Sequence, residues 1–436
     1  MVRSARIRPR HAHVGPIVHP HNAATLDTGV SLWFPGPRSY TGEDMLELHV
    51  HGGTAVVRSI LEALGSIDQV RMAEAGEFSR RAFDNDKMDL TTLEGVADLI
   101  NAETEAQRRL AVRQAHGELF QMYEQWRQTM VGLMAKIEAF IDFGEEENIE
   151  DEVYAQVCAD ADRLAHEITA HLDDRRQGEI MRSGVALSIV GPPNSGKSTL
   201  VNTLAQRQVA IVSPIAGTTR DIIETTLDIG GYPLVVRDTA GLRRSSRDVV
   251  EMEGIRRAMD SARDADIRLC MVDARQALEG SHAPLLHSEE WKALLNLPHT
   301  FVVLNKADTL SATDKATIVD KWTRDHQTTG NNPALLLSCK SMVGWDSLMQ
   351  ALAGHIRDTW DASTGANQMP LTKTRHRLHL KQCLQHLNAF RQIDEGSVVL
   401  GAEELRRSSR ALGRITGKVG IEDVLDVLFS QFCIGK

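Results

Sequence analysis

A glycine-rich loop that ends in a lysine is the part of this chain best suited to chemistry. The stretch GPPNSGKST, residues 191–199, follows the apolar run VALSIV and precedes the helical run KSTLVNTLAQ. It matches the pattern G-x-x-x-x-G-K-[ST], whose glycines let backbone N–H groups turn toward phosphate oxygens. In such a loop Lys197 contacts the outer phosphates and the Ser198 hydroxyl binds Mg²⁺. The loop predicts a nucleotide site with Asn194, Ser195, Gly196, Lys197, Ser198 and Thr199.

Three later motifs indicate which nucleotide binds. In DTAG, at the end of the run YPLVVR, Asp238 can hold Mg²⁺ through water and the Gly241 N–H can contact the γ-phosphate. In NKAD, the carboxylate of Asp308 can accept both guanine N1–H and N2–H, and adenine lacks this donor pair. SCK ends the next strand, where its loop would close over the base. In this order the motifs resemble those of GTPases, and they predict GTP at Asn305, Lys306, Asp308, Ser338, Cys339 and Lys340.

The stretch IAGTTRD, residues 215–221, lies between the phosphate loop and DTAG. Thr219 would complete the Mg²⁺ shell when GTP is bound. The alternative is an ordinary Gly-Thr turn.

Composition limits the class of protein. The chain has 436 residues, enough for two or three domains, and its five cysteines form no CxxC pair. This usage indicates a reducing compartment, not a disulfide framework or a zinc site. No apolar run is long enough to span a membrane. The net charge of −10 means that RNA binding would need a local basic patch.

Proline spacing and apolar periodicity indicate the domain organisation. No proline lies between Pro37 and Pro192 or after Pro370, so both stretches can hold long helices. Between them, short apolar runs alternate with helical patterns, which is typical of a parallel sheet covered by helices. We therefore expect an α/β P-loop GTPase domain inserted in an α-helical bundle and preceded by an α+β domain. The predicted boundaries are 1–86, 87–183, 184–361 and 362–436.

Several longer stretches resemble one family, that of the tRNA-modification GTPases MnmE and TrmE. They are LWFPGPRSYTGEDMLELHVHGG, AGEFSRRAFDNDKMDL, IDFGEEE and the terminal FCIGK, and the resemblance covers nearly the whole chain. It implies a homodimeric GTPase that, with an MnmG-type partner carrying FAD, adds an aminomethyl-type group to C5 of the wobble uridine of tRNA. That group would be carboxymethylaminomethyl or taurinomethyl. A tetrahydrofolate derivative, 5-formyl- or methylene-, would supply the one-carbon unit.

The stretch EGVADLINAETEAQRR is similar to the mitochondrial members of the family. The resemblance therefore implies a mitochondrial location, with the bacterial cytoplasm as the alternative. The first 26 residues carry four arginines and no acidic residue, as a transit peptide does, although a solvated basic tail has the same composition.

The same resemblance implies a K⁺ site and a catalytic glutamate. The K⁺ ligands would be Asn194, Ser213, Ile215 and Thr218, with Ser198 and Thr219 on Mg²⁺. A cation there would neutralise the developing phosphate charge, as an arginine finger does in other GTPases. Such a finger increases the rate roughly 10³- to 10⁵-fold. Glu251 resembles the glutamate that positions the attacking water. A solvated helix face, or a transfer of this role to Glu253, is the alternative.

Folate contacts are implied at Glu47, Lys87 and Lys436. Glu47 shares a strand face with His49 and His51, but H-x-H alone is weak support for zinc. The family begins with a glycine-rich strand and a loop carrying an arginine, whereas RPRHAHVG already resembles an interior segment. About 40 residues would therefore precede it, and the folate and dimerisation domain at 1–86 is expected to be truncated.

Cys433, in the terminal CIGK, has three interpretations. It fits a prenylation signal poorly. It could be a buried apolar residue. The resemblance implies instead a nucleophile on a short tail that reaches the folate domain, where a cation such as Lys436 would enrich the thiolate. Cys433 and Glu251 are the expected catalytic residues.

Two basic stretches could bind tRNA, although charged helix faces are usually only solvated. Their cations are Lys373, Arg375, Arg377, Lys381, Arg406, Arg407, Arg410, Arg414 and Lys418. The alternative function is that of a ribosome-assembly GTPase acting as a binding switch. Such a switch has no use for a folate pocket or a terminal cysteine.

Overall fold

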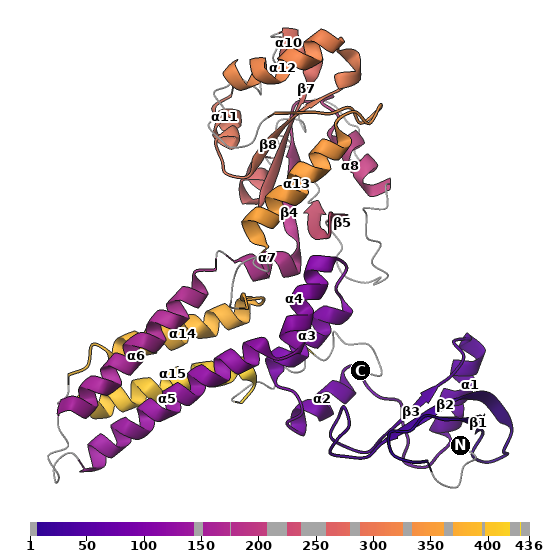
Figure 1. Cartoon of the computed structure of the whole chain (residues 1–436), viewed down its shortest axis with the longest axis vertical. Helices are drawn as coiled ribbons and strands as arrows, with labels where there is room; N and C mark the ends of the chain where they lie inside the picture. The colour runs from indigo at the N-terminus through magenta and orange to yellow at the C-terminus, as the bar shows by residue number, and fades with distance from the viewer. Residues whose placement is uncertain are drawn as a thin grey trace, which may run out of the picture. The chain divides into compact units, whose positions relative to one another are not determined.

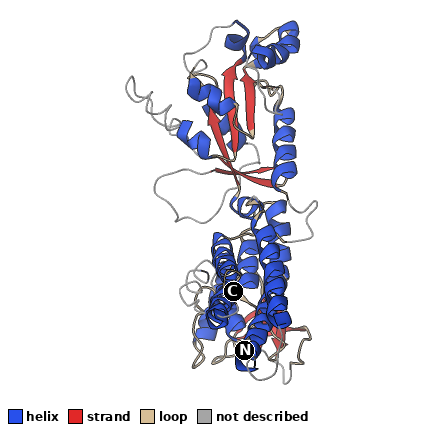
Figure 2. Ribbon diagram, turned by 90° about the vertical axis from the view of Figure 1, so that its left-hand side faces the viewer, coloured by secondary structure: helices blue, strands red, loops and turns tan. Residues whose placement is uncertain are grey.

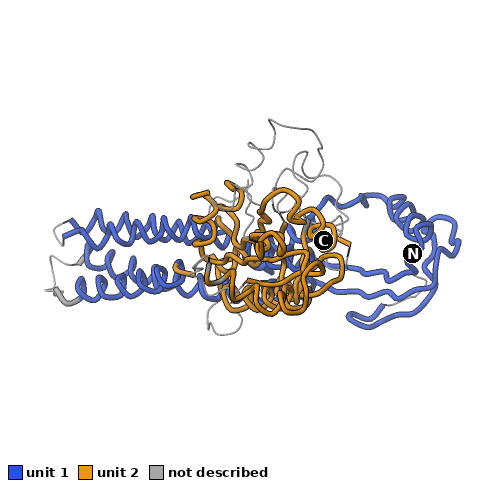
Figure 3. Tube along the Cα trace, turned by 90° about the horizontal axis from the view of Figure 1, so that it is seen from above, with its two compact units in different colours: residues 1–100, 111–172, 375–436 blue, residues 101–110, 173–374 orange. Residues whose placement is uncertain are grey.

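The structure is a computed structural model. It describes residues 7–143, 151–174, 176–206, 225–236, 259–279, 288–325, 334–361, 369–394, 397–418 and 428. The chain forms two compact units (Figure 3). Unit 1 comprises residues 1–100, 111–172 and 375–436, and unit 2 comprises residues 101–110 and 173–374. Among the described helices, none is long and apolar enough to cross a membrane.

Unit 2 is built on a six-stranded sheet with the order β5-β6-β4-β7-β8-β9. Figure 1 labels β4, β5, β7 and β8 of this sheet, and Figure 2 shows strands in red. Its strands are β4 Val185–Val190, β5 Thr225–Ile229, β6 Tyr232–Val236, β7 Ile267–Asp273, β8 Thr300–Asn305 and β9 Leu335–Leu336. β5 pairs antiparallel with β6, and the other neighbouring pairs are parallel. The helices of the unit are α7 Gln177–Ser183, α8 Lys197–Gln206, α10 Ala274–Glu279, α11 Glu289–Leu295, α12 Ala312–Asp325 and α13 Trp345–Trp360, with the short 3₁₀ helix η2 Ala307–Thr309.

Both faces of this sheet are covered, which explains why its central strands are apolar at almost every position. Successive residues of β7 point to opposite faces. Leu269 and Met271 join the core on one side, together with apolar residues of α13. Cys270 and Val272 join the core on the other side, together with apolar residues of α11 and α12.

Unit 1 contains a helical bundle. Its helices are α3 Leu90–Ile100, α5 Glu118–Phe143, α6 Asp151–Leu172, α14 Thr374–Phe390 and α15 Val398–Thr416, and helix α4, Glu105–Ala115, begins in unit 2 and ends in unit 1. α5 packs against both α6 and α15. Its buried residues recur at helical spacing: Leu119, Tyr123, Trp126, Met130, Leu133 and Ile137. Leu428 is also buried, against Leu90, Leu93 and Ala97 of α3.

A small α+β region opens unit 1. Its strands are β1 His13–Val18, β2 Thr25–Phe34 and β3 Met45–His49, followed by the helices α1 Thr54–Gly65 and α2 Glu77–Asp84. The strands form an antiparallel sheet in the order β1-β2-β3, and α1 contacts β2. The expected mixture of a P-loop α/β sheet, a helical bundle and an α+β region is therefore present.

Candidate nucleotide-binding site

The phosphate loop joins the end of β4 to the start of α8, as the sequence predicts. Glycine is needed at both glycine positions of the motif. A Cβ atom at Gly191 would lie 2.1 Å from the Met271 carbonyl oxygen. Gly196 has a φ of +103°, and its Cβ would lie 2.1 Å from Asn305 Nδ2. The loop therefore follows a tight path against β7 and β8 that only glycine allows.

Polar groups at this loop fit a phosphate ligand. The Ser195 hydroxyl is buried and has no hydrogen-bond partner among the described residues. The first turn of α8 offers backbone N–H groups that no helix carbonyl accepts, which suits an anion. Lys197 Nζ donates to the carbonyl oxygens of Gly191 and Pro192 at 2.8 and 2.9 Å, and burial lowers its pKa. Ser198, one residue on, is exposed and can offer its hydroxyl to Mg²⁺.

Asn305 connects the phosphate loop to the base-binding loops. It ends β8 and is only 3% exposed. Its Nδ2 donates to the Ser195 carbonyl oxygen at 2.8 Å, and its Oδ1 accepts from the Cys339 N–H at 3.4 Å. One side chain thus holds three sequence motifs together, and this explains why the motif requires an amide that donates and accepts.

Asp308 is placed to read a guanine. Its Oδ1 accepts a hydrogen bond from the Ser338 hydroxyl at 2.6 Å, and this bond is the main reason why the pKa of Asp308 is lowered. The side chain is exposed, so the charged carboxylate can still accept from a base. The Ala307 N–H donates to the Leu337 carbonyl at 3.0 Å, which joins the NKAD and SCK segments.

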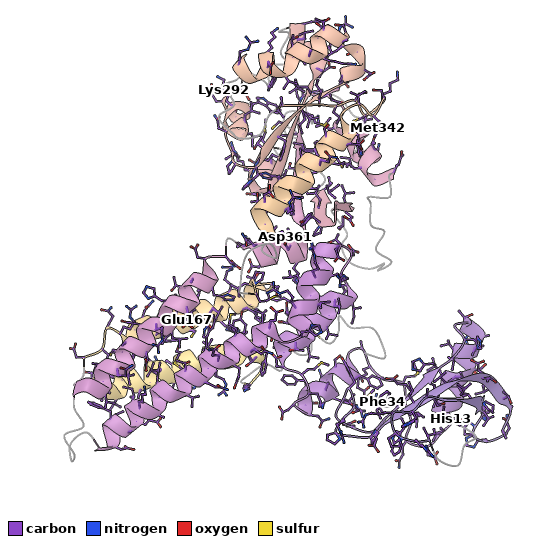
Figure 4. The ribbon with its side chains drawn as sticks, in the orientation of Figure 1. His13, Phe34, Glu167, Lys292, Met342 and Asp361 are labelled. Atoms are coloured by element: carbon purple, nitrogen blue, oxygen red, sulfur yellow. The ribbon has the colours of Figure 1, made fainter. Side chains whose placement is uncertain are left out.

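The loop after β9 forms the rest of the base-binding region. The Met342 N–H donates to the Ser338 carbonyl at 2.8 Å, and Met342 is labelled at this edge of unit 2 in Figure 4. Burial raises the pKa of the Cys339 thiol to about 11, so this cysteine is neutral and its backbone N–H makes the contact. Lys340 is exposed.

Comparison with known sequences agrees with this geometry. A model described as the MnmE helical domain matches residues 90–433, and one described as the GTP-binding protein TrmE N-terminus matches residues 1–87. The chain belongs to the MnmE/TrmE family. The predicted resemblance to that family is confirmed.

Known relatives match this chain along almost its whole length. The "5-taurinomethyluridine-[tRNA] synthase subunit GTPB3, mitochondrial" of Danio rerio is 45% identical over 433 residues, covering 98% of this chain and 86% of the relative. The protein of the same name from Homo sapiens is 44% identical, covering 98% and 85%. The "tRNA modification GTPase MnmE" of Rickettsia akari is 42% identical over 430 residues, covering 98% and 91%.

Several predicted site residues of this MnmE/TrmE member lie outside the described residues. In residues 207–224 these are Ser213, Ile215, Thr218 and Thr219. In residues 237–258 they are Asp238, Gly241 and Glu251, and in residues 429–436 they are Cys433 and Lys436. Their roles remain predictions.

The two described folate candidates have partners within the chain. Glu47 is on β3, and its Oε2 atom lies 3.2 Å from His49 Nε2. Lys87 Nζ donates to the Pro37 carbonyl at 2.9 Å. His51 pairs with Asp27 instead, with 2.9 Å between His51 Nδ1 and Asp27 Oδ1. Across the described ranges, no group of three or more His, Cys, Asp or Glu residues could hold a metal ion.

Many of the cations considered for tRNA bind neighbouring groups within unit 1. Arg375 contacts Glu94 at 3.1 Å and the Arg414 carbonyl at 2.8 Å. Lys418 contacts Glu124 at 2.9 Å. Arg377 donates to a backbone carbonyl, and Arg406, Arg407 and Arg410 pair with carboxylates. These stretches are not a row of uncompensated positive charge.

One contact at the site was not predicted. Asp273, which ends β7, places Oδ2 2.8 Å from Lys306 Nζ. The available signal was an aspartate directly after a buried apolar run, because the carboxyl ends of parallel strands commonly carry site residues.

Proposed function

We propose that this chain acts in the modification of the wobble uridine of tRNA and that its GTPase cycle serves that reaction. It is a GTP-hydrolysing enzyme of tRNA modification, like the MnmE proteins it resembles along almost its whole length. The observation that carries the GTP assignment is the Asn305 side chain, which joins the phosphate loop to both base-binding loops. A ribosome-assembly switch is not favoured, because the family match extends through both flanking regions.

The product would be an aminomethyl-type group on C5 of the uridine, carboxymethylaminomethyl or taurinomethyl. The name of the vertebrate relatives, a 5-taurinomethyluridine synthase subunit of mitochondria, supports the second form and a mitochondrial location. A bacterial cytoplasm is the alternative, since bacterial relatives are nearly as similar. We expect a homodimer that works with an MnmG-type partner carrying FAD. The domains are proposed at 1–86, 87–183, 184–361 and 362–436.

Within the GTP site each residue has a distinct task. Lys197 would leave the loop carbonyls it now contacts and move its ammonium to the outer phosphates. The Ser195 hydroxyl, buried without a partner in the described chain, would bond a phosphate oxygen. Ser198 and Thr219 would hold Mg²⁺, and Asp238 would hold it through water. When bound, the metal neutralises charge on the phosphates.

A K⁺ ion is proposed at Asn194, Ser213, Ile215 and Thr218. The described part of this set fits, because Asn194 is exposed and its φ of +62° is a conformation that asparagine tolerates. Glu251 would position the attacking water. We expect faster GTP hydrolysis in potassium than in sodium chloride at equal ionic strength. Asn194→Gly should remove that difference, since glycine accepts the backbone but lacks the amide. Equal parent rates in both salts would refute the K⁺ site.

A tetrahydrofolate derivative is proposed to bind at Glu47, Lys87 and Lys436. The exposed carboxylate of Glu47 fits a ligand that presents N–H donors, as a pterin does. Cys433 would deliver a thiolate to the uridine or to the folate adduct. Because these roles depend on residues outside the described part of the chain, the test must address the reaction itself.

The decisive experiment measures wobble nucleosides by mass spectrometry after reaction with the partner, tRNA, folate and GTP. Cys433→Ser should retain GTP hydrolysis and lose modification, because serine keeps the volume but not the nucleophile. Cys158→Ser is the matched control, since Cys158 lies half-buried on α6, a helix that carries none of the proposed site residues. Normal modification by Cys433→Ser would mean that Cys433 only packs in the protein interior.

A further inference from the structure

Asp273 lies at the edge of the sheet where the guanine loops begin. It ends β7 and is paired in register with Asn305 on β8. Its side chain is only 13% exposed, and its two oxygens have different partners. Oδ2 lies 2.8 Å from Lys306 Nζ, and Oδ1 accepts from the Arg275 N–H at 3.0 Å.

Lys306 is held in an unusual conformation next to this carboxylate. Its φ is +63°, which a non-glycine residue rarely adopts. Hydrogen bonds fix the backbone at and just after Lys306. The Ala307 N–H donates to the Leu337 carbonyl and the Thr309 N–H donates to the Lys306 carbonyl, both at 3.0 Å. With the backbone fixed, the direction of the long side chain depends on what its ammonium contacts. In the structure that group is Asp273.

The position of Lys306 between two other site residues places its stem near the nucleotide. Asn305 reaches the phosphate loop, and Asp308 presents the acceptor for the guanine edge. A base that bonds Asp308 must therefore lie beside the residues between them. An extended methylene chain can pack on the flat face of a purine, as lysine and arginine stems do on apolar surfaces.

We propose that Asp273 is a positioning residue for the nucleotide base. It holds the Lys306 ammonium and so orders the lysine stem as a platform for one face of the purine before the nucleotide arrives. Lysine loses much rotamer freedom when it is ordered, and an ordered stem spares the ligand that loss. The contact concerns the face of the base and not its edge, so it favours purines without selecting guanine.

A competing explanation is purely structural, because Oδ1 also caps α10. Aspartate and asparagine are comparable N-caps. Asp273→Asn therefore keeps the cap and removes only the charge that holds Lys306. Asp273→Ala removes both. Glu279→Gln is the matched control, since Glu279 lies on the same helix and pairs with Arg275 at the surface.

The test is a titration of the full chain with fluorescent GDP and IDP, alongside thermal unfolding. We expect Asp273→Asn to keep its melting temperature and to raise Kd roughly two- to fivefold, the range for a partly exposed ion pair. GDP and IDP should weaken by the same factor. Glu279→Gln should bind normally.

A double-mutant cycle decides whether Asp273 acts through Lys306. Lys306→Ala should weaken binding, and adding Asp273→Asn to it should cause no further loss. Additive effects would overturn the proposal. So would normal binding by Asp273→Asn, or a loss that appears only in Asp273→Ala together with a lower melting temperature.

Discussion

Asn305→Ala should separate the phosphate loop from the base-binding loops. The side chain supplies the donor for the Ser195 carbonyl at 2.8 Å and the acceptor for the Cys339 N–H at 3.4 Å. Alanine replaces neither. Asn305 is 3% exposed, so the change leaves two polar backbone groups in a region that water reaches poorly.

The size of the effect follows from these two contacts. An unsatisfied buried group costs about 1–3 kcal/mol, and the longer bond to Cys339 contributes at the low end of that range. Together they suggest about 2–4 kcal/mol against the ordered loops. If most of this cost falls on the nucleotide-competent arrangement, Kd for GDP rises roughly 30- to 1,000-fold.

The assay is equilibrium titration with a fluorescent GDP, because unfolding of a chain with two units does not yield one free energy. Asn202→Ala is the control, since Asn202 is exposed on α8. Asn305→Asp should be as harmful as the alanine, because its carboxylate would put an acceptor against the Ser195 carbonyl. A Kd within twofold of the parent for Asn305→Ala would refute the reasoning.

Three further predictions follow from single features. Gly196→Ala should abolish GDP binding in the same titration, because its φ is +103° and its Cβ would clash with Asn305 Nδ2. Asp308→Asn should weaken GTP and favour xanthosine triphosphate in competition binding, since the amide offers a donor where guanine N2–H needs an acceptor and xanthine presents a C2 carbonyl oxygen. Glu124 has a pKa lowered to about 2, first by its hydrogen bond to Arg127. It therefore stabilises the fold above about pH 4.5, and this contribution is lost as pH falls toward 2. Glu124→Gln should flatten the fall in melting temperature between pH 5 and 3; an unchanged slope would contradict this.

The nucleotide site could be predicted from the sequence because its motifs encode backbone geometry. Gly191 and Gly196 occupy positions where any Cβ would collide with β7 or β8, so the pattern of glycines records the path of the loop. The strands around it could be predicted for a related reason. A parallel strand buried on both faces must be apolar throughout, and β4 and β8 have no exposed residue.

Side-chain burial in the bundle was harder to predict. In α5 the polar-tipped Tyr123 is fully buried, whereas its apolar neighbour Met122 is only half-buried. Leu378 of α14 is apolar and yet 54% exposed. An apolar stripe is wide enough to admit either neighbour, and the packing partner decides between them. That partner comes from a distant part of the chain.

The Asp273–Lys306 contact could not be predicted for a different reason. It requires β7 and β8 to be adjacent, and the order of strands in a parallel sheet is not written in any local pattern. Once Asp273 and Asn305 stand side by side in register, the contact follows directly, because Lys306 comes next in the chain.

The basic stretches show why counting cations is a weak guide to RNA binding. Arg375 looks in the sequence like one charge in a cluster, but it bonds Glu94 and two carbonyls at the end of α15. Its charge holds α3, α14 and α15 together, and a phosphate would have to displace those contacts. Phosphate contacts that release counterions are favourable when the cation is otherwise solvated. In a chain with a net charge of −10, the cations best suited to contact tRNA are therefore those that have no carboxylate partner. Only the fold shows which cations these are.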